Sequence, residues 1–276
     1  MTDIGDVLGE WLESMEAAGL SSRTIGDRAL TLRVLARQLD PLTVTRRDIT
    51  RYFADQREVW GPGTRHTRHV QVKAFYTWAV DVGHVEVNPM AKMKAPKAPQ
   101  GVPNPISTNE LTAILARVNR KRTRAMVVLA AYQGLRIHEV AKFRGEDIRG
   151  DTLRVRGKGG KVANLPLHPA VAKVAETFPR TGWWFPSYGC YGKAGGHVTG
   201  DNVGGVIKDA MQRAGIDGHA HQLRHWYGTQ TLKSSGGNLL IAQKLLRHAT
   251  VATTAIYAQV DDDDLRAAVA GLPTAD

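Results

Sequence analysis

Apolar residues recur every three or four positions from residue 4 to about residue 95, and this period is typical of amphipathic helices. The pattern is interrupted in three places, near Gly19, at Asp40-Pro41 and at Gly61-Pro62-Gly63. Glycine and proline at these points predict turns between four helices. The segment Thr45-Arg-Arg-Asp48 has the spacing of a capping box, which predicts the start of the third helix. Residues 1–95 are therefore predicted to form a small, all-helical domain.

A stretch without periodicity follows. Four prolines and one glycine lie between residues 94 and 106, and proline cannot donate the main-chain hydrogen bonds of a helix interior or a central strand. We therefore predict an interdomain linker over 96–106. The segment Ser107-Thr-Asn-Glu110 has the spacing of a second capping box and predicts a helix that opens a second domain, 107–276.

The second domain has one segment with strand character. Apolar and basic residues alternate over 152–156, glycines turn the chain at 157–160, and 162–167 returns, so this segment predicts a β-hairpin. The other predicted elements are helices at about 169–178, 200–214, 222–234, 238–247, 251–258 and 261–270, with a loop over 182–196. The predicted fold class is mainly α, with an all-helical N-terminal domain and a mostly helical second domain that contains a small β-hairpin or sheet.

The chain is strongly basic. It contains 37 Lys and Arg residues against 26 Asp and Glu, a formal net charge of +11. Residues 1–100 contain 14 basic and 12 acidic residues, whereas 101–276 contain 23 and 14, so most of the positive field belongs to the second domain. A polyanion such as nucleic acid is the expected partner, although a basic enzyme with ordinary solubility needs has the same composition.

Other features of the sequence narrow the class of protein. The single cysteine, Cys190, excludes an intramolecular disulfide and a zinc site made of several cysteines. The longest apolar run, 125–132, has 8 residues, whereas a membrane-spanning helix needs roughly 20, so this run predicts a buried core helix and no membrane association. The first residues lack the basic and apolar regions of a signal peptide. The expected location is the cytoplasm, at the nucleoid of a bacterial or phage-infected cell.

Two pairs of residues three positions apart combine an arginine with a histidine or a glutamate. His221 and Arg224 lie on one face of a predicted helix and can converge on one phosphate. Arg136 follows the apolar helix and precedes Glu139, so it is either a phosphate ligand or a structural partner of Glu139 or Glu146. Taken singly, each pair is also compatible with an exposed helix face.

Two lysines and a tyrosine add groups that can transfer protons or attack phosphorus. Lys158 and Lys161 lie at the predicted hairpin tip, where nearby arginines would prepare an ammonium to act as a general acid. Tyr257 follows His248 by nine positions. Guanidiniums favour its phenolate, and a phosphotyrosine ester conserves bond energy for rejoining, so no nucleotide cofactor is expected. Solvent-facing lysines and a core tyrosine are the structural alternatives.

The fourth predicted helix carries a basic stripe. Its members fall at three- and four-residue spacing: Arg65, Arg68, His69 and Lys73. Such a stripe can follow the phosphates of a DNA groove, although stripes of this kind also occur as solvated helix faces. Together with a linker to a basic second domain, it predicts two lobes that clamp duplex DNA.

Five motifs follow one another through the second domain: Gly134-Leu-Arg136-Ile-His-Glu139, Arg156-Gly-Lys158-Gly-Gly-Lys161-Val-Ala-Asn-Leu-Pro166-Leu, His221-Gln-Leu-Arg224-His225, Leu245-Leu-Arg-His248 and Thr253-Thr-Ala-Ile-Tyr257. In this order and at these spacings they resemble the tyrosine recombinases, the phage-integrase and Xer family, over essentially all of 107–260. The first domain resembles the core-binding helical domain of that family by its position and helical content.

The resemblance implies a role for each matched residue. Tyr257 would attack the scissile phosphate and form a 3′-phosphotyrosine with a free 5′-hydroxyl. Arg136 and Arg224 would clamp the non-bridging oxygens. Lys158, in preference to Lys161, would protonate the departing 5′ oxygen.

The same resemblance implies supporting residues and partners. His221 would act as acid or base near the nucleophile, His248 would hydrogen-bond the phosphate, and Glu139 would orient a histidine. No metal is implied. The implied partners are double-stranded DNA, a homotetramer on two DNA sites, and a directionality factor or a host DNA-bending protein.

The chain departs from the family pattern at one motif position. Arg247 stands where many members have glycine, and glycine adopts the left-handed conformation at a helix end more cheaply, so the local backbone is in question. The helical pattern begins by residue 4, which favours a recombinase without an arm-site-binding domain. The four aspartates 261–264 are well placed at the start of a C-terminal tail helix, which would dock on a neighbouring subunit or on its own chain.

Integration or excision of a mobile element is the function expected first. Xer-type resolution of chromosome or plasmid dimers is the alternative within the family. A type IB topoisomerase has a similar set of residues, and a DNA-binding regulator that does not cut is the alternative from another class.

Overall fold

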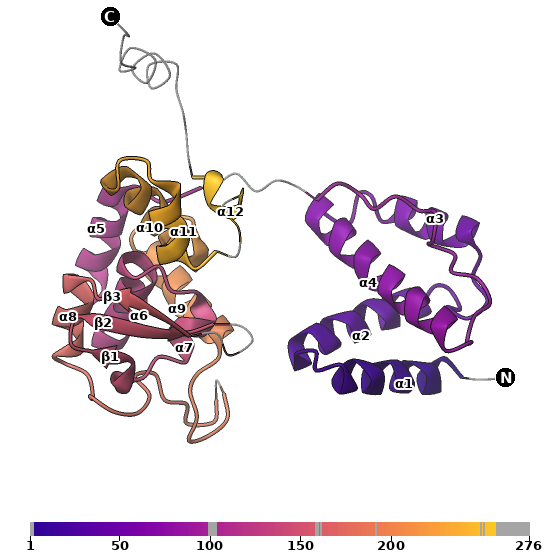
Figure 1. The fold of residues 1–276 in the computed structure, drawn as a ribbon, viewed down its shortest axis with the longest axis horizontal. Helices are drawn as coiled ribbons and strands as arrows, with labels where there is room; N and C mark the ends of the chain where they lie inside the picture. Colours follow the sequence, from indigo (N-terminus) through magenta and orange to yellow (C-terminus); the bar gives the residue numbers. More distant parts are fainter. Residues whose placement is uncertain are drawn as a thin grey trace, which may run out of the picture. The chain divides into compact units, whose positions relative to one another are not determined.

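The computed structural model describes residues 3–98, 104–157, 160, 162–190, 192–248, 250 and 252–257. The chain divides into two compact units, Met1–Gly101 and Val102–Asp276, each with its own hydrophobic core. In the described part of the first unit, the helices are α1 (Ile4–Ala17), α2 (Ser22–Ala36), α3 (Arg46–Asp55) and α4 (Pro62–Asp81) (Figure 1).

The first unit is built from amphipathic helices that share an aromatic core. The capping box predicted at the start of α3 is confirmed, because the Thr45 side chain accepts from the Asp48 amide and the Asp48 carboxylate accepts from that of Thr45. Trp11 of α1 meets Phe75 of α4 edge to face, with 5.2 Å between ring centroids. Both rings are at most 2% exposed. The helices therefore hold one another through side chains placed at helical spacing.

The second unit is mostly helical and contains a small sheet. Its described elements are α5 (Thr108–Arg117), α6 (Lys121–Tyr132), α7 (Ile137–Ala141), the 3-10 turn η1 (Gly145–Asp147), β1 (Ile148–Arg149), β2 (Thr152–Arg156), β3 (Val162–Pro166), α8 (Pro169–Ala175), α9 (Gly200–Arg213), α10 (Ala220–Ser234), α11 (Leu239–Leu246) and α12 (Ala252–Ala255). The mainly α fold class predicted from the sequence is confirmed. The second capping box is also present, since Ser107 and Glu110 exchange the expected hydrogen bonds at the start of α5.

The sheet is antiparallel with the strand order β1-β2-β3. The predicted hairpin corresponds to β2 and β3, which pair in a register that sets Leu153 opposite Leu165. The sequence did not predict β1, because a strand of two residues is too short to show a period of two. These leucines are buried, so the inner face of the sheet joins the core of the second unit.

Four segments that lie far apart in the sequence are brought together around α10. The apolar run 125–132 is confirmed as a core helix, because residues 125–131 of α6 are all buried. Helix α10 packs against α6 and α11, and α11 packs against α12 (Figure 1). The turn after α6, the face of α10 and the ends of α11 and α12 therefore meet, and these segments carry the predicted chemistry.

Some predicted features lie outside the described residues. They are the tail helix at 261–270 with its aspartates 261–264, and residues 99–103 of the linker. In the part of the chain that the structure describes, no helix combines the length and apolar character needed to span a bilayer.

Candidate active site

Arg136 is placed by a tight turn between α6 and α7. Gly134 makes this turn with a φ of 59°, and a Cβ at that position would lie 2.3 Å from Cδ1 of Tyr227, so only glycine fits there. The main-chain nitrogen of Arg136 donates to Oε2 of Glu139 at 2.8 Å, and its Nη1 donates to Oε1 at 3.2 Å. The Arg136 side chain remains 42% exposed, so a phosphate can reach this guanidinium.

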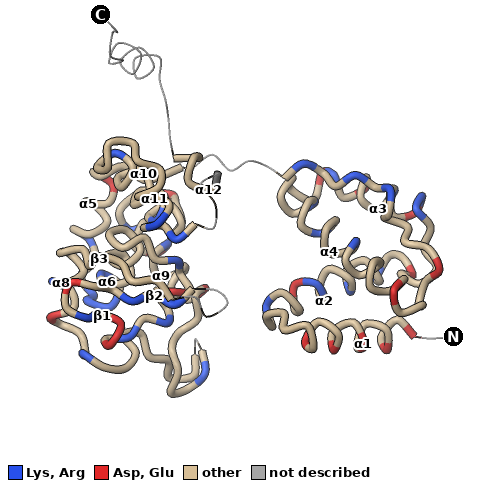
Figure 2. The backbone as a smooth tube through the Cα atoms, in the orientation of Figure 1, with Lys and Arg blue, Asp and Glu red and all other residues tan. Residues whose placement is uncertain are grey.

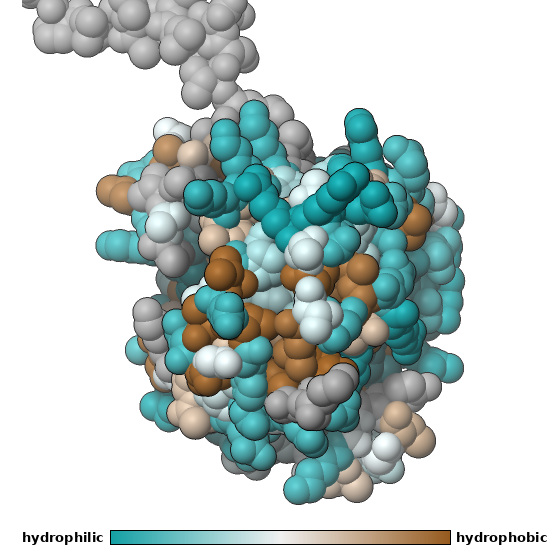
Figure 3. Space-filling model, turned by 90° about the vertical axis from the view of Figure 1, so that its right-hand side faces the viewer, coloured by the Kyte–Doolittle hydropathy of each residue, from teal (hydrophilic) through white to brown (hydrophobic). Residues whose placement is uncertain are grey.

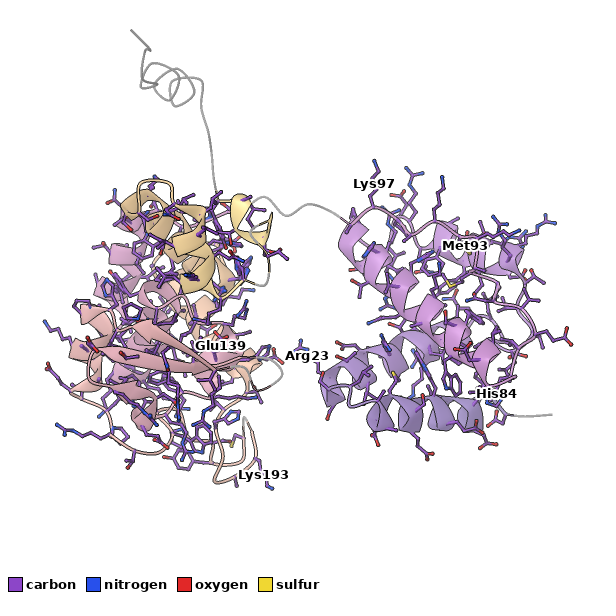
Figure 4. The ribbon with its side chains drawn as sticks, in the orientation of Figure 1. Arg23, His84, Met93, Lys97, Glu139 and Lys193 are labelled. Atoms are coloured by element: carbon purple, nitrogen blue, oxygen red, sulfur yellow. The ribbon has the colours of Figure 1, made fainter. Side chains whose placement is uncertain are left out.

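Arg247 brings a second guanidinium to the same carboxylate. Its Nη2 donates to Oε2 of Glu139, labelled on α7 in Figure 4, at 2.6 Å. Among the described residues, Arg247 is the one non-glycine residue with a positive φ, 55°, so the helix end is left-handed despite the side chain. The prediction that Glu139 orients a histidine is wrong, because its hydrogen bonds within the described residues run to Arg136 and Arg247. A carboxylate beside two guanidiniums is the more favourable pairing.

Arg224 is the buried centre of the cluster. It is 1% exposed, and its Nη1 and Nη2 donate to the carbonyl oxygens of Gly134 and Leu246. This arginine therefore ties the turn before Arg136 to the end of α11. Burial, followed by the charges of Arg136 and Arg247, lowers the pKa of Arg224 to about 9, so the guanidinium still carries its charge at neutral pH.

The cluster has more positive than negative charge. Arg136 and Arg247 act electrostatically on Arg224, and the carboxylate of Glu139 acts on it in the opposite direction. A single carboxylate cannot balance three guanidiniums, so the pocket favours an anion such as a phosphodiester.

Two of the predicted histidines are neutral at physiological pH. Burial is the main cause that lowers the pKa of His221 to about 4, and the charges of His225 and Arg224 act in the same direction. Burial, then Arg224 and Arg136, lowers the pKa of His248 to about 4. A neutral imidazole can both donate and accept a hydrogen bond, so these rings can contact a phosphate or a proton without adding charge.

Tyr257 reaches the cluster directly after α12. The residue is 7% exposed, and its hydroxyl lies 2.9 Å from Nδ1 of His225. Its ring stacks with that of His248 at 6.2 Å and an interplanar angle of 15°. Burial raises the pKa of Tyr257, whereas the charges of Arg224 and Arg136 act against this rise. The phenol is therefore inside the electrostatic reach of both predicted phosphate ligands.

The resemblance implies no role for His225, although this residue is part of the third motif. Adjacent residues on a helix do not share a face, so the spacing of His221 and Arg224 gives no signal for His225. The available signal was a different spacing, since His221 and His225 are four apart and their rings touch at 4.4 Å between centroids.

The candidate general acids lie outside the described residues. These are Lys158 and Lys161, and their roles remain predictions. The strands on either side of them are paired as far as Arg156 and Val162.

The residues of the basic stripe predicted on α4 are less exposed than a DNA-binding stripe would be. His69 is wrong as a DNA contact, because it is 2% exposed and packs against Phe53 with 5.5 Å between ring centroids. The guanidinium of Arg68 lies over the Trp60 ring at 4.4 Å from its centroid. The other members, Arg65 and Lys73, are partly buried, as is Arg68.

Helix α3 carries the more exposed basic surface of the first unit. Arg46, Arg47 and Arg51 are exposed along it, and Figure 2 shows basic residues along this helix. Figure 3 presents a face on which apolar side chains gather in the middle and hydrophilic ones surround them. The exposed arginines of α3 are placed where phosphates could reach them.

A metal-dependent arrangement is not seen in the described residues, which contain no group of three His, Cys, Asp or Glu side chains placed to hold a metal ion. The chemistry of the cluster rests on guanidiniums, imidazoles and a phenol, which are the groups that the sequence singled out.

Known proteins have sequences similar to this chain. Residues 105–264 match the model of the phage integrase family. A tyrosine recombinase XerD from Caulobacter vibrioides is 32% identical over 227 residues, which cover 74% of this chain and 73% of that protein. A tyrosine recombinase XerC from Xylella fastidiosa is 33% identical over 198 residues, which cover 68% of this chain and 67% of the relative.

Solved structures have a similar fold. An integrase from mycobacterium phage Brujita is 37% identical with a TM-score of 0.50, covering 95% of this chain and 90% of that one. A lambda integrase dimer bound to a COC′ core site is 17% identical with a TM-score of 0.75, covering 95% of this chain and 100% of that one. At that level of identity the lambda structure supports the fold alone.

Proposed function

Because the chain belongs to the phage integrase family of tyrosine recombinases, enzymes of site-specific DNA strand exchange, we propose that it integrates or excises a mobile element through a phosphotyrosine at Tyr257. The observation that carries this proposal is the position of the Tyr257 hydroxyl. It lies 2.9 Å from an imidazole and within the field of Arg136 and Arg224. A phenol in such a pocket is suited to attack phosphorus rather than to fill a core.

In the proposed reaction, the phenolic oxygen of Tyr257 forms a bond to the scissile phosphorus while the bond from phosphorus to the 5′ oxygen breaks. Arg136, the exposed guanidinium, binds the non-bridging oxygens directly. Arg224 stabilises the developing charge at short range from its buried position. His248 donates a hydrogen bond to the same phosphate, and Lys158 protonates the departing oxygen. Rejoining is the reverse reaction, with a 5′-hydroxyl from the partner strand.

No cofactor enters this scheme. The phosphotyrosine ester has nearly the same bond energy as the phosphodiester that it replaces, so the energy of the broken bond is kept for rejoining. Arg136 and Arg224 supply the electrostatic stabilisation for which many phosphoryl transfer enzymes use metal ions.

The proposed substrate is duplex DNA held by both units, with four copies of the chain on two sites. Lambda integrase has been solved as a dimer on a core site and as a tetramer on a Holliday junction. In this chain, the exposed arginines of α3 and the partly buried Arg65, Arg68 and Lys73 would contact phosphates in the first unit. A directionality factor or host DNA-bending protein would act with it at the bacterial nucleoid, in the cytoplasm.

Dimer resolution is the second candidate, favoured by the identity of about one third to XerD and XerC proteins. The two functions differ in the sites that recombine. A duplex selected by the protein from a randomised library can be placed on two plasmids, or twice on one plasmid.

Strand exchange between the selected site and a non-identical second site supports integration. Exchange restricted to two identical repeats on one plasmid supports resolution. Relaxation of supercoils without exchange would indicate a topoisomerase, and tight binding with no cleavage would indicate a regulator; either result contradicts the proposal.

A further inference from the structure

The hydroxyl of Tyr257 has a specific partner. Among the described residues, its hydrogen bond runs to Nδ1 of His225 at 2.9 Å. Nδ1 of His248 is 3.0 Å from Oγ1 of Thr254 instead, and the rings of His248 and Tyr257 lie nearly parallel. The His221 ring packs edge-on against His225, with 4.4 Å between centroids. The imidazole that touches the attacking oxygen is therefore neither His221 nor His248, the two histidines to which the resemblance gives a role.

The surface of α10 is shaped for this contact. His225 and Gly228 are three positions apart and share a helix face. A Cβ on Gly228 would lie 2.9 Å from Cζ of Tyr257, so the missing side chain lets the phenol ring lie directly on the helix. The ring rests on Gly228 while its hydroxyl meets His225.

In the resting protonation states the phenol can donate and the imidazole can accept. Burial, followed by the charges of His219 and Arg224, lowers the pKa of His225, which keeps the ring neutral with one nitrogen free to accept. Burial raises the pKa of Tyr257, so the phenol holds its proton until attack begins. A neutral phenol is a poor nucleophile and must lose that proton as the bond to phosphorus forms.

We propose that His225 is a catalytic residue, the general base that takes the proton of Tyr257 during strand cleavage; this inference rests on the proposed function. The O–H bond of Tyr257 breaks and an N–H bond forms at Nδ1 of His225. At the same time the phenolic oxygen bonds to phosphorus, and the 5′ oxygen leaves with a proton from Lys158. On rejoining, the imidazolium of His225 returns its proton to the phenol.

Single-turnover cleavage of a nicked duplex that carries the selected site tests this role. The scissile phosphate is prepared with either oxygen or sulfur at the 5′ bridging position. A thiol has a pKa of about 8.5, far below that of an alcohol, and leaves without protonation. The sulfur substrate therefore removes the need for an acid on the leaving side and leaves the attacking side unchanged.

His225→Asn keeps a hydrogen-bond acceptor but cannot take up the proton. We expect it to cleave both substrates about 100-fold or more slowly than the wild type, the loss typical for a general base. Lys158→Ala is the matched control, slow on the oxygen substrate and restored by sulfur. Binding of the intact site and the melting temperature should match those of the wild type.

Two results overturn the proposal. One is cleavage of the oxygen substrate by His225→Asn within about threefold of the wild-type rate. The other is a slow His225→Asn variant that regains the wild-type rate on the sulfur substrate, which would place the imidazole on the leaving side. If His225→Asn does not fold, His225→Gln is judged by the same criteria. Failure of the wild type to form an adduct with either substrate is a distinct outcome that refutes the proposed function itself.

Discussion

Arg247 donates from Nη2 to Oε2 of Glu139 at 2.6 Å, although the two residues are 108 positions apart. The ion pair joins the end of α11 to the start of α7, and Arg136 binds the other side of the same carboxylate. The Arg247 and Glu139 side chains are 10% and 8% exposed, so each charge compensates the other away from solvent. Arg247 thus holds the carboxylate that positions Arg136, from a backbone conformation in which glycine would be less strained.

Replacing Arg247 separates the backbone strain from the ion pair. Arg247→Gly and Arg247→Ala both remove the guanidinium, but only glycine relieves the left-handed conformation. A Cβ in this conformation costs about 1 kcal/mol. The free energy of unfolding of the alanine variant, measured with urea, should therefore be lower than that of the glycine variant by this amount. Equal stability of the two variants would show that the left-handed turn is not present in solution.

The carboxylate that Arg247 binds should be more important for stability than Arg247. Glu139→Gln leaves Arg247 buried without a charged partner, and loss of one member of a buried pair costs about 3–5 kcal/mol. Adding Arg247→Gly to this variant should recover part of the loss, because it removes the unpaired charge. Urea unfolding of the wild type, the two single variants and the double variant measures the coupling between Glu139 and Arg247. Additive changes in the free energy of unfolding would contradict direct pairing.

Gly228 should be required for the placement of Tyr257. In Gly228→Ala the new Cβ would meet the ring at 2.9 Å and displace the hydroxyl, so cleavage should fall by about tenfold or more, as expected for a misplaced nucleophile. Gly205→Ala on α9 is the control, since a Cβ there meets nothing within 4 Å. Single-turnover cleavage and DNA affinity are measured on both. An active Gly228→Ala protein would mean that the phenol does not rest on this helix during attack.

Two histidines whose pKa values are lowered predict loss of stability in acid. His221 and His248 have pKa values lowered from 6.5 to about 4, so between these values the unfolded chain binds more protons than the folded one. Their contribution is complete above pH 6.5 and is lost as the pH falls toward 4. The urea midpoint of His248→Asn should therefore fall less between about pH 7 and 5 than that of the wild type. An identical fall in both proteins would show that His248 is not held neutral.

The sequence predicted local features well where a short pattern has one physical meaning. The capping boxes at Thr45 and Ser107 were confirmed because each needs only residues three apart. The fold class followed from helical periodicity and one alternating segment. Four residues singled out from the motifs lie within electrostatic reach of Arg224: Arg136, His221, His248 and Tyr257.

The errors arose where contacts depend on packing between distant segments. In α4 the buried positions are 69, 72, 75, 76 and 79, so His69 lies on the core face although its basic neighbours suggested a stripe. The ion pair between Glu139 and Arg247 joins residues 108 positions apart, and the contact between His225 and Tyr257 joins residues 32 positions apart. No spacing within one helix reveals such contacts, because the relative rotation of the helices decides them.

Identification of the residue that becomes joined to DNA tests the central claim most directly. The wild-type protein is incubated with a nicked duplex of the selected site, the adduct is digested with nuclease and protease, and the modified peptide is sequenced by mass spectrometry. The account predicts a nucleotide on Tyr257 through a 3′-phosphate, and no adduct with Tyr257→Phe at unchanged DNA affinity. An adduct on another residue, or cleavage that persists in Tyr257→Phe, would contradict it.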